Sequence, residues 1–251
     1  MSESVSRSLD GRVVLVTGAH GGFGSAVAVA CAEAGATVVL LGHKVPRLNR
    51  VYDRIAAVGA EPAIYPLDLE GASPDDYAEL AERLESGFGG LHGIVHCAAE
   101  FRGLTPVVHA DPADFARSIH VGLTAPWWLT QAMLPLLAKA DDAAVVFTLD
   151  SPERVGAAYW GGYGVSQFGL RGAVQILHAE LANSRVRVAG LMPGPMRTTL
   201  RARAWVEETD RQAVDPSVYA PAAVELLSGA GRSRRGTIWS PTPAELTASP
   251  A

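Results

Sequence analysis

Short aliphatic runs alternate with longer stretches of helical periodicity along almost the whole chain, and this alternation limits the fold more than any other feature. A run that is apolar on both faces is typical of a strand inside a parallel sheet, because helices cover both faces of such a sheet. The alternation therefore predicts an α/β fold of three layers, with a doubly wound, mostly parallel sheet of seven strands between two layers of helices. The expected strands are Arg12 to Thr17, Thr37 to Leu41, Pro62 to Pro66, Gly93 to Cys97, Ala143 to Thr148, Val186 to Leu191 and Thr237 to Trp239.

A helix is expected between the first two strands. Apolar residues from Phe23 to Ala34 recur there at steps of three and four, and Gly35 suits the left-handed end of a helix. Two later helices, one beginning near Leu123 and one from Tyr163 to Leu181, are apolar on more than one face. We expect a single domain over residues 1–251, with a core from about 9 to 239 and a loosely ordered tail from Ser240 to Ala251.

Composition argues against several classes of function. The formal net charge of −5 argues against a nucleic-acid partner, because proteins that bind nucleic acid present a basic surface. No apolar run approaches the ~20 residues that span a bilayer, and Met1 to Gly11 lacks the apolar stretch of a signal peptide. We therefore expect a cytoplasmic protein without membrane contact. The histidines lie in separate segments, so no metal site is expected.

Glycines cluster where the first strand turns into the first helix. Residues 17 to 24 read Thr-Gly-Ala-His-Gly-Gly-Phe-Gly. Glycines let phosphate oxygens approach peptide N–H groups, and a helix N-terminus adds roughly half a positive charge. The position favours a Rossmann-type site for the pyrophosphate of a dinucleotide, whereas the alternative is a turn that only needs positive φ. The residues expected at this site are Thr17, Gly18, His20, Gly22, Phe23 and Gly24.

The end of the second strand bears on the choice of dinucleotide. In Rossmann folds a carboxylate there accepts the ribose hydroxyls of NAD, and its charge would repel the extra phosphate of NADP. This chain has Gly42, His43 and Lys44 at that point, with no acid. We expect NADP(H) to be favoured over NAD(H), with His43 and Lys44 near the 2′-phosphate. The alternative is that both are solvated loop residues.

The spacing Thr-Gly-x-x-x-Gly-x-Gly resembles the cofactor loop of the short-chain dehydrogenase/reductase (SDR) family, and the likeness extends from about Leu9 to Trp239. The segments Trp160 to Tyr163 and Val146 to Thr148 look closest to the YciK-like branch of bacterial short-chain reductases. The resemblance implies further cofactor residues. These are Asp68 and Leu69 at the adenine, Cys97, Ala98 and Ala99 in the family's Asn-Asn-Ala-Gly segment, Tyr163 and Gln167, and Pro193, Gly194, Met196 and Thr198 near the nicotinamide.

The resemblance also implies a catalytic set that is incomplete here. In the family a Tyr transfers the proton, a Lys four residues later lowers the Tyr pKa, a Ser polarises the carbonyl and an Asn supports a water. Tyr163 matches the Tyr, whereas Gln167, Asp150 and Gly122 stand at the Lys, Ser and Asn positions. A lost cation and a gained acid predict a Tyr163 pKa above the ~10 of a free phenol, which makes Tyr163 a poorer acid and base.

Two features could compensate for these changes. Ser151 could replace the lost Ser if the strand end is slipped or bulged, or a protonated Asp150 could donate a hydrogen bond to a carbonyl oxygen. The alternative for Tyr163 is a buried aromatic residue whose hydroxyl only bonds locally.

We predict an NADP(H)-binding oxidoreductase that transfers hydride to or from a small carbonyl or alcohol substrate, with weakened or altered catalysis. Two other interpretations remain open, since a fold does not define a function. One is a catalytically inactive pseudoenzyme that serves as a cofactor-binding scaffold, subunit or redox sensor. The other is an acid–base pair of Asp150 and Tyr163 that acts without net redox.

The resemblance implies two further features. The helices that begin near Leu123 and Tyr163 pack across two-fold axes in the family, so we expect a homo-oligomer, a dimer or tetramer. Residues 199 to 215 stand where related proteins carry a substrate lid, and their arginines suit an acidic substrate, although a solvated amphipathic helix explains the pattern equally. The residues noted in this stretch are Arg201, Arg203, Trp205, Glu207 and Glu208.

Overall fold

The computed structural model describes residues 7–58, 60–205 and 213–248, and its centre is a sheet of seven parallel strands. All seven predicted strands are present, each with ends within one residue of the prediction. The strand order is β3-β2-β1-β4-β5-β6-β7, which confirms the doubly wound α/β fold. The strands are β1 (Val13–Thr17), β2 (Thr37–Gly42), β3 (Ala63–Pro66), β4 (Gly93–His96), β5 (Ala143–Thr148), β6 (Val186–Leu191) and β7 (Ile238–Trp239).

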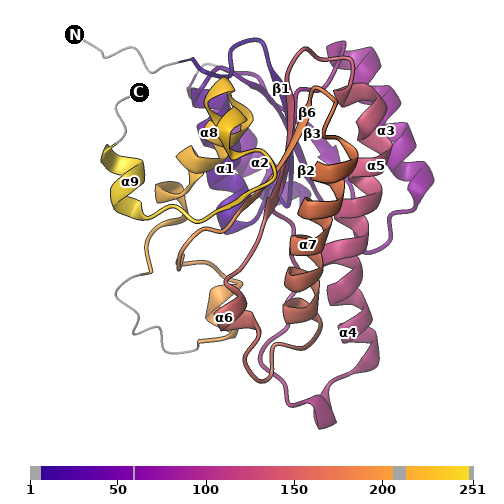
Figure 1. Ribbon diagram of the computed structural model, residues 1–251, viewed down its shortest axis with the longest axis vertical. Coiled ribbons are helices and arrows are strands. Elements are labelled where there is room, and N and C mark those ends of the chain that lie inside the picture. The colour runs from indigo at the N-terminus through magenta and orange to yellow at the C-terminus, as the bar shows by residue number, and fades with distance from the viewer. Residues whose placement is uncertain (1–6, 59, 206–212, 249–251) are drawn as a thin grey trace.

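Helices cover both faces of the sheet (Figure 1). One layer contains α1 (Gly22–Glu33), α2 (Val45–Ala56) and α8 (Ala220–Leu227). The other layer contains α3 (Pro74–Phe88), α5 (Ala125–Leu137) and α7 (Gly161–Glu180). Short helices complete the chain: α4 (Pro112–Ile119), α6 (Pro152–Val155), α9 (Pro243–Ala248), a π-helical turn at His120–Thr124 and 3₁₀ turns at Val107–His109, Arg201–Arg203, Pro216–Val218 and Gly229–Arg234.

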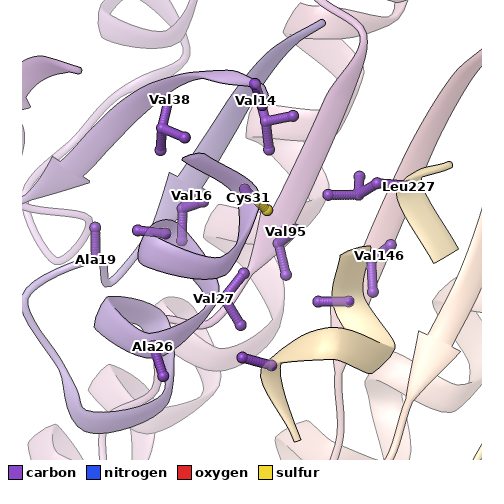
Figure 2. Close-up of a cluster of buried hydrophobic side chains, with 14 of the residues drawn as sticks. Val14, Val16, Ala19, Ala26, Val27, Cys31, Val38, Val95, Val146 and Leu227 are labelled. Carbon is purple, nitrogen blue, oxygen red and sulfur yellow. The ribbon is translucent and has the colours of Figure 1, made fainter. Parts of the chain in front are cut away.

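Successive residues of each strand point to opposite layers, as strand geometry requires. Figure 2 shows one side of this arrangement, where Val14 and Val16 of β1 lie with Val95 of β4 around Val27 and Cys31 of α1. The intervening residues, such as Leu15, belong to the core on the other face. Both faces of the central strands are therefore buried, which is why their sequences are continuous aliphatic runs.

The connections reverse direction at β1, which pairs with β2 on one side and β4 on the other. Thr17 aligns with Leu41 of β2 and with His96 of β4, so these three strands end at one level. In open parallel sheets ligands bind beyond the carboxyl ends of the strands at such a reversal. The segments that follow β1, β2 and β4 are therefore brought together at the edge where a site is expected.

The tail differs from the prediction. Pro243–Ala248 forms the helix α9 where a loosely ordered segment was expected, residues 240–242 have no regular structure, and 249–251 lie outside the described residues. The Thr242 backbone N–H donates to Glu245 Oε2 at 2.6 Å, and the Glu245 N–H donates to Thr242 Oγ1 at 3.3 Å. This reciprocal capping, which stabilises a helix N-terminus, is the physical reason. Across the described ranges, no helix is long and apolar enough to cross a membrane.

Candidate active site

The glycine loop is closely packed against the segment that follows β4. Gly18 has φ +61°, and a Cβ there would lie 2.8 Å from the backbone nitrogen of Ala98. A Cβ on Gly24 would lie 2.3 Å from the Gly18 carbonyl oxygen although Gly24 has no positive φ. A turn that needs positive φ therefore explains the glycine at position 18 but not the one at position 24. Position 24 needs a glycine because the backbone of the loop approaches it closely at the start of α1.

Thr17 ties this loop to its neighbour. Its buried Oγ1 accepts hydrogen bonds from the backbone N–H groups of Cys97 at 3.2 Å and Ala98 at 3.3 Å. Thr17 does not line the cavity described below, so the structure gives it a supporting role instead of contact with a ligand.

A cavity of about 350 Å³ runs along this edge of the sheet, from the segment after β2 to Tyr163. It brings together nearly all of the residues predicted for the site, whereas Thr17, Ser151 and Gly122 lie outside its lining. The predicted residues that line it are Gly18, His20, Gly22, Phe23, Gly24, His43, Lys44, Asp68, Leu69, Cys97, Ala98, Ala99, Asp150, Tyr163, Gln167, Pro193, Gly194, Met196 and Thr198.

Basic and imidazole side chains gather at the end of the cavity next to β2. The rings of His20 and His43 are edge to face with centroids 4.9 Å apart, and His43 Nδ1 lies 3.9 Å from Asp68 Oδ1. Lys44 and Arg47 line the cavity at the same end. Burial lowers the pKa of His20 to about 4, with the positive charges of its neighbours adding to the effect, so His20 is neutral near pH 7.

His20 also explains the glycine at the end of β2. A Cβ on Gly42 would lie 2.3 Å from His20 Nδ1, a buried nitrogen that has no hydrogen-bond partner among the described residues. The imidazole ring therefore occupies the space into which a longer side chain at position 42 would extend.

Tyr163 and Asp150 form a hydrogen-bonded pair at the other end of the cavity. The Tyr163 hydroxyl donates to Asp150 Oδ2 at 3.1 Å. Asp150 Oδ1 accepts the Ser151 N–H at 2.7 Å and lies 2.9 Å from Arg154 Nη1. Burial raises the pKa of Tyr163 well above its ordinary value, the charge of Asp150 and the hydrogen bond to it add to the rise, and Arg154 opposes it. The direction agrees with the prediction, although burial is the largest cause.

Gln167 is turned toward the backbone. Its Oε1 accepts the N–H of Asp150 at 2.8 Å, and its side chain is buried at the cavity wall. A neutral amide cannot lower the pKa of Tyr163 as a cation would.

The structure supports neither of the two features that could compensate for the changes in the catalytic set. Ser151 Oγ donates to Glu153 Oε2 at 2.6 Å and accepts the Arg154 N–H at 3.4 Å, because Ser151 caps α6 instead of facing the cavity. Asp150 accepts hydrogen bonds from Tyr163 and the Ser151 N–H and lies beside the Arg154 guanidinium, so its carboxyl oxygens are already engaged within the protein.

Gly122 does not face the cavity, contrary to its predicted place in the catalytic set. It lies in the π-helical turn His120–Thr124, where a Cβ would be 2.6 Å from Ser166 Oγ. Ser166 of α7 thus fills the space beside Gly122.

Aromatic rings form a wall beside Tyr163 that sequence reasoning missed. Phe101 stacks on Trp160 with centroids 4.9 Å apart and is 5.3 Å from the Tyr163 ring, and Trp205 is 5.6 Å from Trp160. These residues come from three distant segments, so no local pattern could group them. Arg154 was missed as well, because Asp150 precedes α6 and the helical i,i+4 rule does not apply to this pair.

The expected lid is described in part. Residues 199–205 and 213–215 are described, and Arg201, Arg203 and Trp205 line the cavity. Arg201 is buried and its guanidinium lies 4.3 Å from the centre of the Trp205 ring. Glu207 and Glu208 lie outside the described residues.

A parallel sheet with a glycine cradle at its reversal point is the architecture of Rossmann-type α/β proteins. Within that class, the model of the short chain dehydrogenase family matches residues 12–209, and the chain belongs to this family of oxidoreductases.

Known relatives agree with this assignment. The chain is 34% identical to the uncharacterized oxidoreductase YciK of Escherichia coli K12, over 94% of this chain and 93% of that protein. A short chain dehydrogenase structure from Pseudomonas syringae is 38% identical, with a TM-score of 0.90 over 96% of this chain and 98% of that one. One from Escherichia coli CFT073, complexed with NADPH, is 34% identical, with a TM-score of 0.89 over 94% and 98% of the two chains.

Proposed function

We propose that this protein binds NADP(H) and transfers hydride to or from a small carbonyl or alcohol compound, with a weakened proton-transfer step. The observation that carries the proposal is that the glycine cradle and the Tyr163–Asp150 pair line one continuous cavity. A nucleotide in the cradle and a substrate at Tyr163 would then share that space.

The residues of the cavity fit the cofactor. Gly22 and Gly24 leave no room for side chains at the start of α1, where backbone N–H groups and the helix dipole favour a pyrophosphate. His43, Lys44 and Arg47 offer donors and positive charge to a 2′-phosphate, and β2 ends in glycine instead of the acid that NAD-binding sites use. The NADPH complex of the Escherichia coli CFT073 relative supports the same assignment.

The cofactor would supply the hydride donor or acceptor, and the side chains of the chain handle the proton. A substrate hydroxyl that donates to Tyr163 Oη can pass a proton into the hydrogen bond that already runs from Tyr163 to Asp150. Arg154 offsets the charge of Asp150 at the far side of the carboxylate. Because no cation contacts the Tyr163 hydroxyl directly among the described residues and its pKa is raised, part of the ~100- to 10,000-fold benefit of general acid–base catalysis should be lost.

The test pairs binding with turnover. Fluorescence titration should show tighter binding of NADPH than of NADH. A panel of ketones, aldehydes and alcohols should give slow turnover, and Tyr163→Phe should abolish it in a protein that still binds NADPH. Equal affinities for the two nucleotides would contradict the cofactor preference, and failure to bind either would overturn the proposal.

A second candidate is a cofactor-binding protein without turnover, such as a subunit or redox sensor. This candidate is favoured by two hydrogen bonds within the protein. Tyr163 donates to the Asp150 side chain, and Gln167 accepts the Asp150 backbone N–H. NADPH binding without any Tyr163-dependent turnover would favour this candidate over the enzyme.

A further inference from the structure

Arg154 places a positive charge beside the predicted reaction site. Its Nη1 lies 2.9 Å from one oxygen of Asp150, and Tyr163 donates to the other oxygen of the same carboxylate at 3.1 Å. Both Arg154 and Tyr163 line the cavity. A ligand that meets both groups can therefore place an anionic group at Arg154, close to the carbon whose oxygen meets Tyr163.

The guanidinium has donors to spare. An arginine offers five N–H donors, and within the described residues the only polar partner of the Arg154 side chain is Asp150, through Nη1. The side chain is 24% exposed. If Arg154 served only to neutralise Asp150, a bidentate pair would be the geometry that satisfies it best. The single contact instead leaves N–H groups at the cavity wall for a second anion.

The aromatic residues beside Tyr163 indicate what kind of side group the ligand carries. Trp160, Tyr163 and Trp205 line the cavity, and Phe101, which is outside its lining, stacks on Trp160. Leu200 packs against the same cluster and also lines the cavity. An apolar or aromatic group is suited to this wall, because burying it against the rings removes apolar surface from water and allows ring contacts.

We propose that the substrate is a 2-oxo or 2-hydroxy acid with an aromatic or bulky apolar side group, whose carboxylate is held by Arg154 and whose side group lies against Trp160 and Trp205. This inference rests on the proposed function and names the substrate class of that site. Arg154 is then a substrate-binding residue, and Trp205 contributes to the choice of side group.

The experiment measures binding of benzoylformate, an aromatic 2-oxo acid, by calorimetry to the protein saturated with NADP⁺, which cannot reduce it. Methyl benzoylformate tests the charge, because it keeps the ring and ketone but lacks the carboxylate. Pyruvate tests the ring. The acid should bind the unaltered protein at least about tenfold more tightly than the ester, as expected for a hydrogen-bonded charge.

Two variants separate substrate binding from a structural role of Arg154. Arg154→Gln should weaken benzoylformate binding about tenfold or more and leave the ester within about twofold, whereas Arg154→Lys should keep part of the preference for the acid. Trp205→Leu should weaken benzoylformate binding and leave pyruvate binding unchanged. Unaltered NADP⁺ affinity of each variant shows that the fold and the cofactor site are intact.

Three results would count against the inference. If acid and ester bind the NADP⁺-loaded protein equally, or if Arg154→Gln weakens both alike, Arg154 is only the counter-ion of Asp150 and the substrate class is wrong. Failure of the unaltered protein to bind NADP⁺ is a different result, because it overturns the proposed function together with this inference.

Discussion

Tyr163 and Asp150 share one hydrogen bond, and the charge of Asp150 influences the acidity of the phenol. A phenol with a raised pKa stays protonated through the neutral range, since ionisation would place a second negative charge beside the carboxylate. At neutral pH Tyr163 is therefore protonated, and its hydroxyl donates a hydrogen bond to Asp150.

Asp150→Asn should lower the pKa of Tyr163 relative to the unaltered protein, because the neighbouring negative charge is removed while burial remains. Ultraviolet difference titration of each protein against its own Tyr163→Phe counterpart isolates the signal of this tyrosine from the signals of the other five. In the unaltered protein the Tyr163 signal should appear only above pH ~10. Ionisation of Tyr163 below that pH would contradict the structure.

His20 should resist a simple change of cofactor preference. Gly42→Asp supplies the acid that NAD-binding sites use, but its Cβ would lie 2.3 Å from His20 Nδ1, so the imidazole must move. We expect Gly42→Asp alone to weaken binding of both NADPH and NADH. Adding His20→Ser should restore NADH binding and keep NADPH weak, as measured by fluorescence titration. A single Gly42→Asp variant that binds NADH well would show that the His20 contact is unimportant.

At the scale of elements, the π-helical turn His120–Thr124 and α7 are packed so closely that a side chain at position 122 has no space. Gly122→Asn, which would supply the residue type that the family uses, should destabilise the protein by about 1–3 kcal/mol through overpacking against Ser166. Thermal unfolding measures the loss. Restoring the Asn, Ser and Lys of the family through Gly122→Asn, Asp150→Ser and Gln167→Lys would therefore require a change at Ser166 as well.

Two companion variants make this prediction specific. Gly87→Asn in α3 is the matched control, since nothing lies within 4 Å of a Cβ there, and it should cost less. Ser166→Ala combined with Gly122→Asn should recover part of the stability by removing the hydroxyl that lies 2.6 Å away. Equal losses for Gly122→Asn and Gly87→Asn would count against tight packing at the π-helical turn.

At the scale of the whole molecule, α7, which lies against one side of the sheet (Figure 1), carries an exposed apolar stripe. Val165, Phe168 and Ile176 are about half exposed and recur at helical spacing. Such a stripe suits a contact between copies of the chain, which is the homo-oligomer that the family resemblance implies.

Light scattering at micromolar concentration should give the mass of a dimer or tetramer. Phe168→Glu should lower that mass by placing a charge in the interface, whereas Val58→Glu, at an equally exposed apolar residue after α2, should not. A monomeric mass for the unaltered protein would reject the oligomer.

The strands, the first helix and the glycine loop could be predicted from the sequence because they depend on local patterns. Continuous aliphatic runs identify buried parallel strands wherever they occur, and the glycines of residues 18 to 24 mark a tight turn before a helix. The order of motifs along the chain also predicted the short-chain dehydrogenase family, which the family model confirms. The sequence also predicted, from position alone, that Gln167, Asp150 and Gly122 stand where the family resemblance implies Lys, Ser and Asn.

Only the tertiary structure decided what the side chains at those positions do. Ser151 turns away because it caps α6, Gly122 is closed off by Ser166, and Arg154 shares the carboxylate of Asp150 with Tyr163. Phe101 and Trp205 meet Trp160 from segments far apart in the chain. Local periodicity determines which residues form an element, but the direction and partners of a side chain depend on packing between elements, which no local pattern encodes.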